Sequence, residues 1–142
     1  MGNYKIIMNK IKTALISVSD KKNLKPLLNI LNKNKIKIIS SGGTYKEIKK
    51  LKFKCLEVSE FSKSPEILEG RVKTLHPKIH AGILNERSNK SHQKEMRKNN
   101  FEDIDLVIVN FYPFENTLKT TSNHNKIIEN IDVGGPTMVR SA

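Results

Sequence analysis

The sequence predicts an α/β fold in which helices cover both faces of a mainly parallel sheet, giving three layers. Two observations support this prediction. Segments rich in β-branched residues alternate with segments such as 24–31, where leucines recur at the i, i+3, i+4 and i+7 positions of one helix face. Residues 105–110 (DLVIVN) form a continuous apolar run between polar ends, which is typical of a buried parallel strand. This alternation favours a parallel sheet, because a helix between two strands returns the chain to the end of the sheet where the first strand began.

The first half of the chain is expected to contain three strands and two helices. The strands are predicted at residues 12–18, 36–39 and 55–58. The first helix follows Asn23 as its N-cap, with Pro26 in the first turn, where a proline removes no needed backbone donor. The second helix is lysine-rich, follows the turn at 40–44 (SSGGT), and has Ile48 and Leu51 on its apolar side.

The second half begins with residues 59–82, whose prolines and glycines predict a long irregular segment. Loops of this length inside a compact domain are usually functional or disordered. Residues 88–99 predict an exposed helix with Met96 as its only large apolar residue, and residues 126–131 predict a short helical piece. A last helix is expected after Gly134 and Gly135, with Pro136 as its first residue.

The length of 142 residues accommodates one domain, which we place at residues 12–142 after a short N-terminal extension at 1–11. The extension has no signal-peptide pattern. The single cysteine, Cys55, excludes an internal disulfide and a cysteine-based zinc cluster, and we interpret it as a small core residue. The longest apolar runs, such as 106–109, are too short to span a bilayer, so no membrane partner is predicted.

The charge is strongly positive: 26 basic and 14 acidic residues give a net charge of +12. Such an excess suggests an anionic partner. However, only four of the 26 basic residues are arginine, and aromatic residues make up 6% of the chain. Nucleic-acid recognition usually recruits arginine and stacking aromatics. We therefore interpret most of the charge as a solvated lysine surface and keep a basic nucleic-acid-binding module only as an alternative.

The turn SSGGT follows a strand and opens a helix. Gly42 and Gly43 allow close approach of the backbone to a ligand, the hydroxyls of Ser41 and Thr44 can donate, and a helix N-terminus favours an anion. The turn is neither a Walker loop nor a GxGxxG fingerprint, so it does not indicate a nucleoside triphosphate or a dinucleotide. It predicts either a phosphate site or an ordinary turn with Thr44 as N-cap.

The segment 70–77 (GRVKTLHP) concentrates charge in one irregular stretch. Arg71 and Lys73, two positions apart in extended backbone, point the same way and could clamp one anion, although a plain basic surface loop has the same pattern. His76 and His80 have i, i+4 spacing, but Pro77 argues against a regular helix there. No cysteine or carboxylate nearby completes a ligand set, so we predict no metal site.

Two further residues have the chemistry of a catalytic site. Tyr112 follows the most apolar strand and can either donate to a substrate or simply pack. Asp132 precedes a glycine turn before a helix, where a carboxylate serves as a cap or as a general base. In a parallel sheet, ligands bind beyond the carboxyl ends of the strands. We therefore expect the polar segments after the strands to share one rim of the sheet: 19–21, 41–44 and 110–112.

The order of these motifs closely resembles the IMP cyclohydrolase domain of the bifunctional purine-biosynthesis enzymes, which join it to an AICAR transformylase. The resemblance runs from Lys12 to Ala142. It depends on these stretches: ALISVSDK (14–21), SGGT (41–44), PEILEGRVKTLHPKIHAGIL (65–84), NFYPF (110–114) and IDVGGP (131–136). It implies a methylglyoxal-synthase-like α/β domain that closes the last purine ring, converting FAICAR to IMP with loss of water. Because the ring closure is intramolecular, no cofactor is implied.

The resemblance also implies roles for individual residues. Residues that match substrate-binding positions of the family are Ser19, Asp20, Lys21, Ser41, Gly42, Gly43, Thr44, Arg71, Val72, Thr74, Val109, Asn110 and Val133. Residues that match positions around the reacting groups are Lys73, Tyr112 and Asp132. The implied partner is a phosphorylated purine-pathway nucleotide. A homodimer and a cytoplasmic location are also implied.

The sequence departs from the family pattern in two ways. The pattern continues after Ala142 into a small residue, a lysine with a proton-transfer role and an asparagine, and it is followed by the transformylase domain. We therefore expect the chain to be a fragment, incomplete at the C-terminus of the cyclohydrolase domain. Lys63 and Tyr45 replace residues that are commonly small, outside the core motifs. Alternatives to an active cyclohydrolase are a noncatalytic nucleotide-binding remnant and a related phosphate-binding domain.

Overall fold

A computed structural model describes residues 10–142, so residues 1–9 of the predicted extension lie outside the described part. Four parallel strands form one sheet in the order β3-β2-β1-β4. Their bounds are Thr13–Val18 (β1), Lys37–Ser40 (β2), Leu56–Glu57 (β3) and Leu106–Asn110 (β4). The predicted α/β architecture with a parallel sheet is confirmed.

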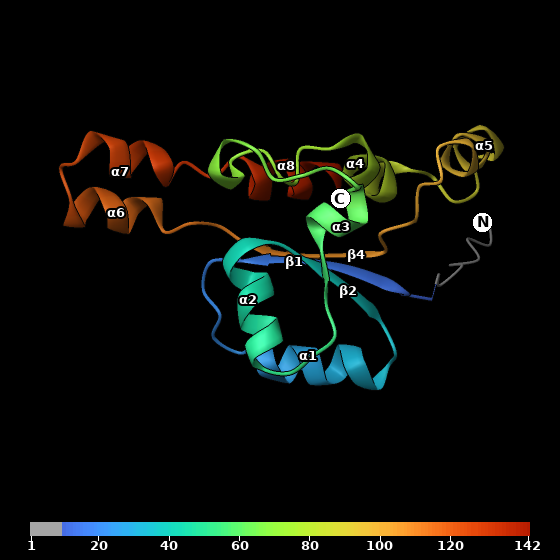
Figure 1. Ribbon diagram of the computed structural model, residues 1–142, viewed down its shortest axis with the longest axis horizontal. Coiled ribbons are helices and arrows are strands. Elements are labelled where there is room, and N and C mark those ends of the chain that lie inside the picture. Colours follow the sequence, from blue (N-terminus) through green and yellow to red (C-terminus); the bar gives the residue numbers. More distant parts are fainter. Residues whose placement is uncertain (1–9) are drawn as a thin grey trace, which may run out of the picture.

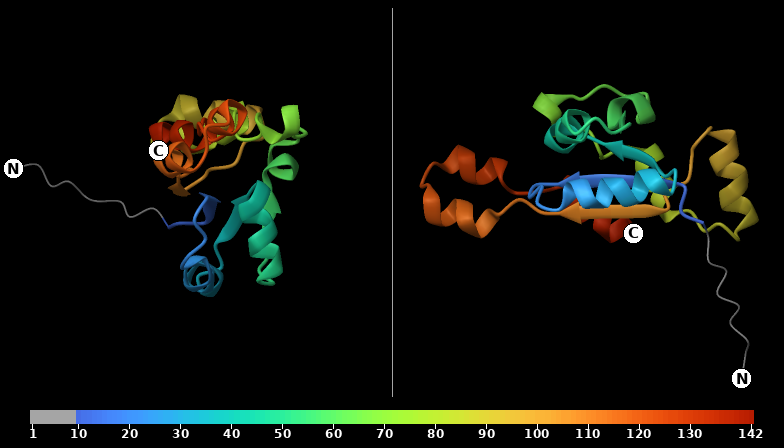
Figure 2. Two further views of the ribbon diagram at one scale, coloured as in Figure 1. Left: turned by 90° about the vertical axis from the view of Figure 1, so that its left-hand side faces the viewer. Right: turned by 90° about the horizontal axis from the view of Figure 1, so that it is seen from below.

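Helices cover both faces of the sheet (Figures 1 and 2). Helices α1 (Leu24–Lys33) and α2 (Gly42–Lys50) lie on one face, and α3 (Val58–Ser62), α4 (Pro77–Leu84) and α8 (Gly134–Ser141) lie on the other. The strand alternation explains this division, because neighbouring side chains point to opposite faces. Ala14 and Ile16 pack beneath α1, whereas Leu15 packs with Met138 of α8.

Strand β4 corrects one expectation. Its apolar run predicted a fully buried strand, but β4 lies at the edge of the sheet and most of its residues are half-buried. Leu106 and Ile108 contact one hydrophobic cluster, and Val107 and Val109 contact the other. An edge strand has a neighbouring strand on one side only. Its side chains are covered by the helices on the two faces of the sheet, but no second strand shields them from solvent at the side.

The segment 59–82 is more regular than expected. It includes most of α3, a 3₁₀ turn at Leu68–Gly70 and the start of α4. Pro77 does not break α4, because it is the first residue of the helix, where its missing N–H is not needed. His76 is the N-cap, and its Nδ1 accepts a hydrogen bond from the N–H of Lys78 at 3.1 Å. The irregular stretch is therefore limited to residues 63–76, which the 3₁₀ turn interrupts, and its part around 69–74 borders the candidate site.

Helix caps differ from the predictions at several positions. Asn23 is at the N-cap of α1, but it has φ of 60° and makes no capping hydrogen bond through its side chain to the described residues. Ser41, not Thr44, is the N-cap of α2. Pro136 is the third residue of α8, after Gly134 and Gly135, and not the first. The differences at α2 and α8 shift a helix start by two or three residues, whereas α1 begins where it was predicted.

Three more helices complete the described chain. Helix α5 (Lys90–Lys98) matches the predicted exposed helix and buries Met96. Helix α7 (His124–Glu129) matches the predicted short helix, whereas α6 (Phe114–Thr120) was not predicted, because Leu118 is half exposed and no apolar repeat marks this helix. Helices α6 and α7 form a hairpin that projects from one end of the sheet (Figure 1).

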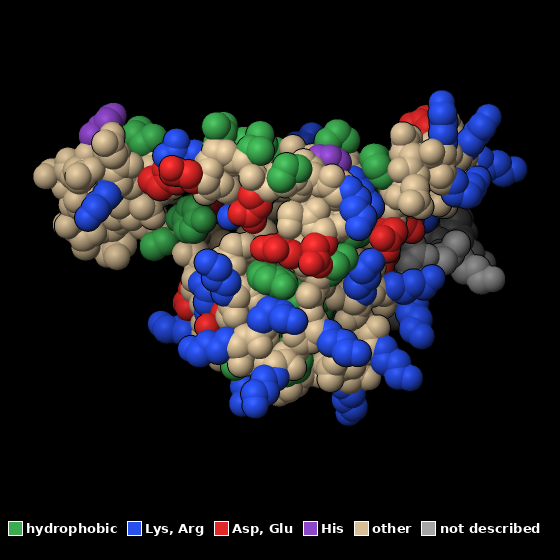
Figure 3. Space-filling view, viewed as in Figure 1, with side chains coloured by type: hydrophobic (Ala, Val, Ile, Leu, Met, Phe, Trp, Pro, Cys, Tyr) green, Lys and Arg blue, Asp and Glu red, His purple; other side chains and the backbone are tan. Residues whose placement is uncertain are grey.

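Figure 3 shows Lys and Arg side chains spread over the layer of α1 and α2 and over the end formed by α5. They do not gather at one point of this face. Within residues 10–142, no helix is both long enough and apolar enough to cross a membrane.

Candidate functional site

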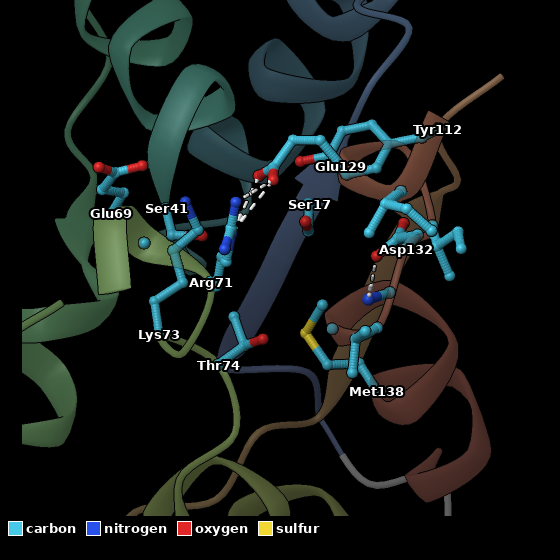
Figure 4. Close-up of a pocket in the computed structure, with 16 residues that line it drawn as sticks. Ser17, Ser41, Glu69, Arg71, Lys73, Thr74, Tyr112, Glu129, Asp132 and Met138 are labelled. Carbon is cyan, nitrogen blue, oxygen red and sulfur yellow. Dashed lines mark hydrogen bonds and ion pairs between the residues drawn. The ribbon is translucent and has the colours of Figure 1, made fainter. Parts of the chain in front are cut away.

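A cavity of about 440 Å³ lies at the carboxyl end of β1 (Figure 4). One wall is the irregular segment around residues 69–74, and the opposite wall runs from α7 to the start of α8. Seven of the residues singled out from the sequence line this cavity: Ser41, Arg71, Lys73, Thr74, Tyr112, Asp132 and Val133. The tertiary structure therefore gathers residues that are separated by up to 92 positions along the chain.

The rim beside the cavity is held together by Asn110. Its Oδ1 accepts hydrogen bonds from the N–H groups of Ser19 at 2.6 Å and Asp20 at 3.1 Å. Its Nδ2 donates to the carbonyl oxygen of Asp20 at 2.9 Å. Asn110 thus ties the turn after β1 to the end of β4. The expected meeting of these polar segments on one rim is confirmed.

The N-terminus of α2 forms the next part of the rim. The Thr44 hydroxyl accepts a hydrogen bond from the N–H of Val18 at 3.0 Å and donates to the carbonyl oxygen of Val18 at 2.9 Å. Thr44 therefore fastens α2 to β1 and does not cap the helix. Among the described residues, no side chain caps the first turn of α2, so its N–H groups remain available for an anion.

Two lysines flank this helix start. Gly42 has φ of +55°, and a Cβ atom placed on it would lie 2.9 Å from Lys73 Nζ. A Cβ atom on Gly43 would lie 3.7 Å from Lys21 Nζ, and Lys21 Nζ also donates to the carbonyl oxygen of Ser19 at 3.1 Å. The two ammonium groups and the helix N-terminus together create a small region of positive potential, suited to a phosphate group.

Arg71 and Lys73 line the same cavity, but they do not form the simple pair of free cations that their spacing predicts. The Arg71 guanidinium is engaged by Glu129 of α7, with 2.6 Å between Nη2 and Glu129 Oε2 and 3.1 Å between Nε and the same oxygen. This hydrogen bonding raises the pKa of Arg71. Lys73 instead reaches toward Gly42.

Thr74 and Asp132 lie against the glycines that begin α8. Thr74 is buried, and a Cβ atom placed on Gly134 would lie only 2.6 Å from its Oγ1. Asp132 Oδ1 accepts a hydrogen bond from the N–H of Gly135 at 2.9 Å. Val133 is the N-cap residue of α8, and the Asp132 carboxylate just before it satisfies an N–H of the first turn, so the capping role is present. Asp132 also borders the cavity.

The remaining predicted residues occupy different places. Tyr112 and Val133 are about half exposed at the cavity mouth. Val72 is half-buried and makes an isolated bridge to Ile67, and Val109 packs into the core beside α8. Seven predicted residues of the rim do not line the cavity: Ser19, Asp20, Lys21, Gly42, Gly43, Thr44 and Asn110.

Other lining residues were missed by the sequence reasoning, among them Ser17, Glu69, Glu129 and Met138. Ser17 could have been predicted from the sequence, because it is a polar residue inside the otherwise mostly apolar strand TALISV. Glu129 had none, because it meets its partner Arg71 across 58 positions of sequence. Met138 appears in the sequence only as one apolar residue of a short helix.

The described residues contain no group of three or more His, Cys, Asp and Glu side chains arranged to hold a metal ion. His76 caps α4, and His80 Nδ1 lies 2.9 Å from the hydroxyl of Ser141 in α8. Cys55 packs against the first hydrophobic cluster, and burial raises the pKa of its thiol to about 12. Cys55 lies just before β3, although the strand predicted at 55–58 included it, and its half-buried side chain stays a thiol at neutral pH.

The fold and the cavity define the class of protein: the chain belongs to the MGS-like domain family, whose model matches residues 23–137. A solved structure with the same fold is the crystal structure of ForH. It has a TM-score of 0.78 and 32% sequence identity, and the match covers 93% of this chain and 67% of that one.

Proteins with a similar sequence specify the relationship further. The chain is 52% identical over 130 residues to the bifunctional purine biosynthesis protein PurH of Prochlorococcus marinus (strain MIT 9301), covering 91% of this chain and 25% of that protein. It is 50% identical over 136 residues to PurH of Magnetococcus marinus, covering 95% and 26%. The chain thus spans about a quarter of the length of these relatives. The resemblance predicted from the sequence motifs is confirmed.

Proposed function

We propose that this chain is an IMP cyclohydrolase domain, which converts FAICAR to IMP with loss of water. The observation that carries the proposal is the cavity that brings Lys73, Tyr112 and Asp132 together beside a positively charged helix N-terminus. Similarity to PurH, a bifunctional purine biosynthesis protein, supports a substrate from the purine pathway. In a bifunctional protein of this kind, formylation of AICAR would belong to another domain.

The 5′-phosphate of the nucleotide would bind at the N-terminus of α2. The backbone N–H groups at the start of the helix can donate to its oxygens, and Lys21, whose Nζ lies beside Gly43, balances its charge. Glycine at position 42 keeps the backbone open to the ligand, and its φ of +55° is one that a side chain would strain. With the phosphate held there, the base would extend into the cavity toward Tyr112 and Asp132.

The reaction requires no external nucleophile. The nitrogen of the carboxamide attacks the carbon of the neighbouring formamide, and the electrons of the C=O bond move to its oxygen. The attacking nitrogen and the formamide nitrogen each lose one proton, and the oxygen gains both. The C–O bond then breaks, the oxygen leaves as water, and the electron pair of the formamide nitrogen forms the C=N bond that completes the pyrimidine ring. Holding the two arms in contact supplies much of the rate enhancement, because the step is intramolecular.

The roles we assign to the three residues follow from the charge or hydrogen-bonding group that each side chain carries. Asp132, a carboxylate at the cavity wall, accepts the proton of the attacking nitrogen. Tyr112, half exposed at the mouth, donates a hydrogen bond to the formyl oxygen. Lys73 is a half-buried cation on a flexible stem, and it stabilises the negative charge that develops on that oxygen.

Binding of IMP to the 142-residue chain, followed by calorimetry, tests the site. We expect Lys73→Ala to weaken IMP binding by at least tenfold. Lys25→Ala is a matched control, because Lys25 is an exposed lysine of α1, on the opposite side of the sheet from the cavity. Equal IMP affinity in the chain and in Lys73→Ala would contradict the assignment, as would RNA binding that added IMP leaves unchanged.

Turnover distinguishes an enzyme from a noncatalytic remnant. A chain that also contains the lysine which the family pattern has after Ala142 should convert FAICAR to IMP, and Asp132→Asn in that chain should reduce the rate by about 100-fold or more. IMP binding without turnover would favour the remnant. The homodimer and the cytoplasmic location rest on the resemblance and stay proposals. Analytical ultracentrifugation with and without IMP tests the dimer.

A further inference from the structure

Arg71 and Glu129 form an ion pair between two walls of the cavity. Arg71 belongs to the irregular segment after the 3₁₀ turn, and Glu129 ends α7 in the projecting hairpin. The carboxylate accepts from both Nε and Nη2 of the guanidinium, so the contact is a two-pronged ion pair. Figure 4 shows this pair across the cavity, near Ser17 at the end of β1.

The pairing leaves one edge of the guanidinium unused. The Nε and Nη2 groups face Glu129, whereas Nη1 has no hydrogen-bond partner within residues 10–142. A planar guanidinium held on one edge is fixed in orientation, so the direction of its other donors is fixed too. Both residues of the pair line the cavity.

We propose that Glu129 is a positioning residue of the nucleotide site. It holds Arg71 across the mouth of the cavity so that Nη1 donates to an oxygen of the bound nucleotide. Without Glu129, the long arginine side chain would lose more conformational entropy on binding the ligand, and affinity would fall. This inference rests on the proposed function, because the ligand that it names is the nucleotide.

A simple surface ion pair makes a different prediction. Both side chains are more than half exposed, at 63% for Arg71 and 54% for Glu129, and exposed pairs contribute little to stability. Loss of Glu129 should therefore leave the melting temperature almost unchanged. An effect on ligand affinity without an effect on folding is the signature of a positioning role.

The test measures IMP affinity of the 142-residue chain by calorimetry, together with the melting temperature. Glu129→Gln should weaken IMP binding about five- to tenfold, and Glu129→Asp should recover most of that loss because it restores the charge. In an Arg71→Gln background, Glu129→Gln should cause no further loss. Glu102→Gln, which breaks the exposed Lys37–Glu102 pair away from the cavity, is the matched control and should leave affinity unchanged.

Three results would overturn the inference: unchanged or tighter IMP binding by Glu129→Gln, better binding by the isosteric Gln variant than by the Asp variant, or additive losses in the double variant. If the unaltered chain binds IMP and Glu129→Gln binds it equally well, only the role of Glu129 fails. If the unaltered chain does not bind IMP at all, the proposed function fails and this inference fails with it.

Discussion

The hydroxyl of Thr44 forms two hydrogen bonds with the backbone of Val18, accepting from its N–H at 3.0 Å and donating to its carbonyl oxygen at 2.9 Å. Thr44 is in the first turn of α2 and is 4% exposed, and Val18 is the last residue of β1. One buried side chain thus sets where the N-terminus of α2 lies relative to the sheet.

Replacing Thr44 by Val should therefore destabilise the fold and disturb the site. The isosteric change leaves two backbone groups of Val18 without their partner, which costs about 1–3 kcal/mol. Denaturant unfolding should show this loss, and IMP affinity should fall with it. Thr44→Ser keeps the hydroxyl and is expected to lose less in both measurements. A Val variant as stable as the unaltered chain would contradict this reading of the contact.

Gly42 and Gly43 should differ in their tolerance of alanine. Gly42→Ala strains a backbone with φ of +55° by about 1–2 kcal/mol and brings a methyl group to within 2.9 Å of Lys73 Nζ. Gly43→Ala meets only Lys21 Nζ, at an ordinary contact distance of 3.7 Å. We expect Gly42→Ala to lose both stability and phosphate affinity, and Gly43→Ala to lose much less. Calorimetry with inorganic phosphate and thermal melting compare the two variants directly.

Asp132 combines a structural and a chemical role that two substitutions can separate. Asp132→Asn retains an oxygen for the N–H of Gly135, so the free energy of unfolding should change little. Asp132→Ala removes the cap and should cost about 1 kcal/mol. Both variants should lose conversion of FAICAR, because neither can accept a proton. Retained turnover in the Asn variant would limit Asp132 to its capping role.

Cys55 should be unreactive in the folded chain. Burial raises the pKa of its thiol from 9.0 to about 12, so at pH 8 the folded protein holds on the order of a thousandfold less thiolate than the unfolded chain. Because Cys55 is the only cysteine, a thiol reagent reports on it alone. The reagent should react slowly in buffer and quickly in urea. Fast labelling of the folded chain would contradict the burial of this group.

The same pKa shift predicts a loss of stability in alkali. Between pH 9 and 12 the unfolded chain releases the Cys55 proton and the folded chain keeps it, so the free energy of unfolding falls as the pH rises. Cys55→Ala lacks this contribution. Its stability should therefore decline less between pH 8 and 10 than that of the unaltered chain, measured by urea unfolding at both pH values.

Local patterns were enough to predict most of the elements. The leucines of α1 and the alternation of Ala14, Leu15 and Ile16 are signals within a few residues, and their periods match helix and strand directly. Helix α6 was missed for the same reason, since its exposed Leu118 leaves no apolar period to detect. The edge position of β4 could not be predicted either, because an apolar run does not state how many strands flank it.

The sequence by itself determined the fold class, the four strands with most of the helices between them, and the motifs that end at the rim of the sheet. The carboxyl ends of parallel strands lie at the same end of a sheet. The polar segments after β1, β2 and β4 could therefore be expected to lie together without knowledge of the tertiary structure. Only the tertiary structure decided three contacts. Glu129 forms an ion pair with Arg71, and the Thr44 hydroxyl bonds α2 to β1. Lys73 lies beside Gly42. These contacts join residues between 26 and 58 positions apart. No short-range period encodes such distances, because they depend on how the helices pack over the sheet.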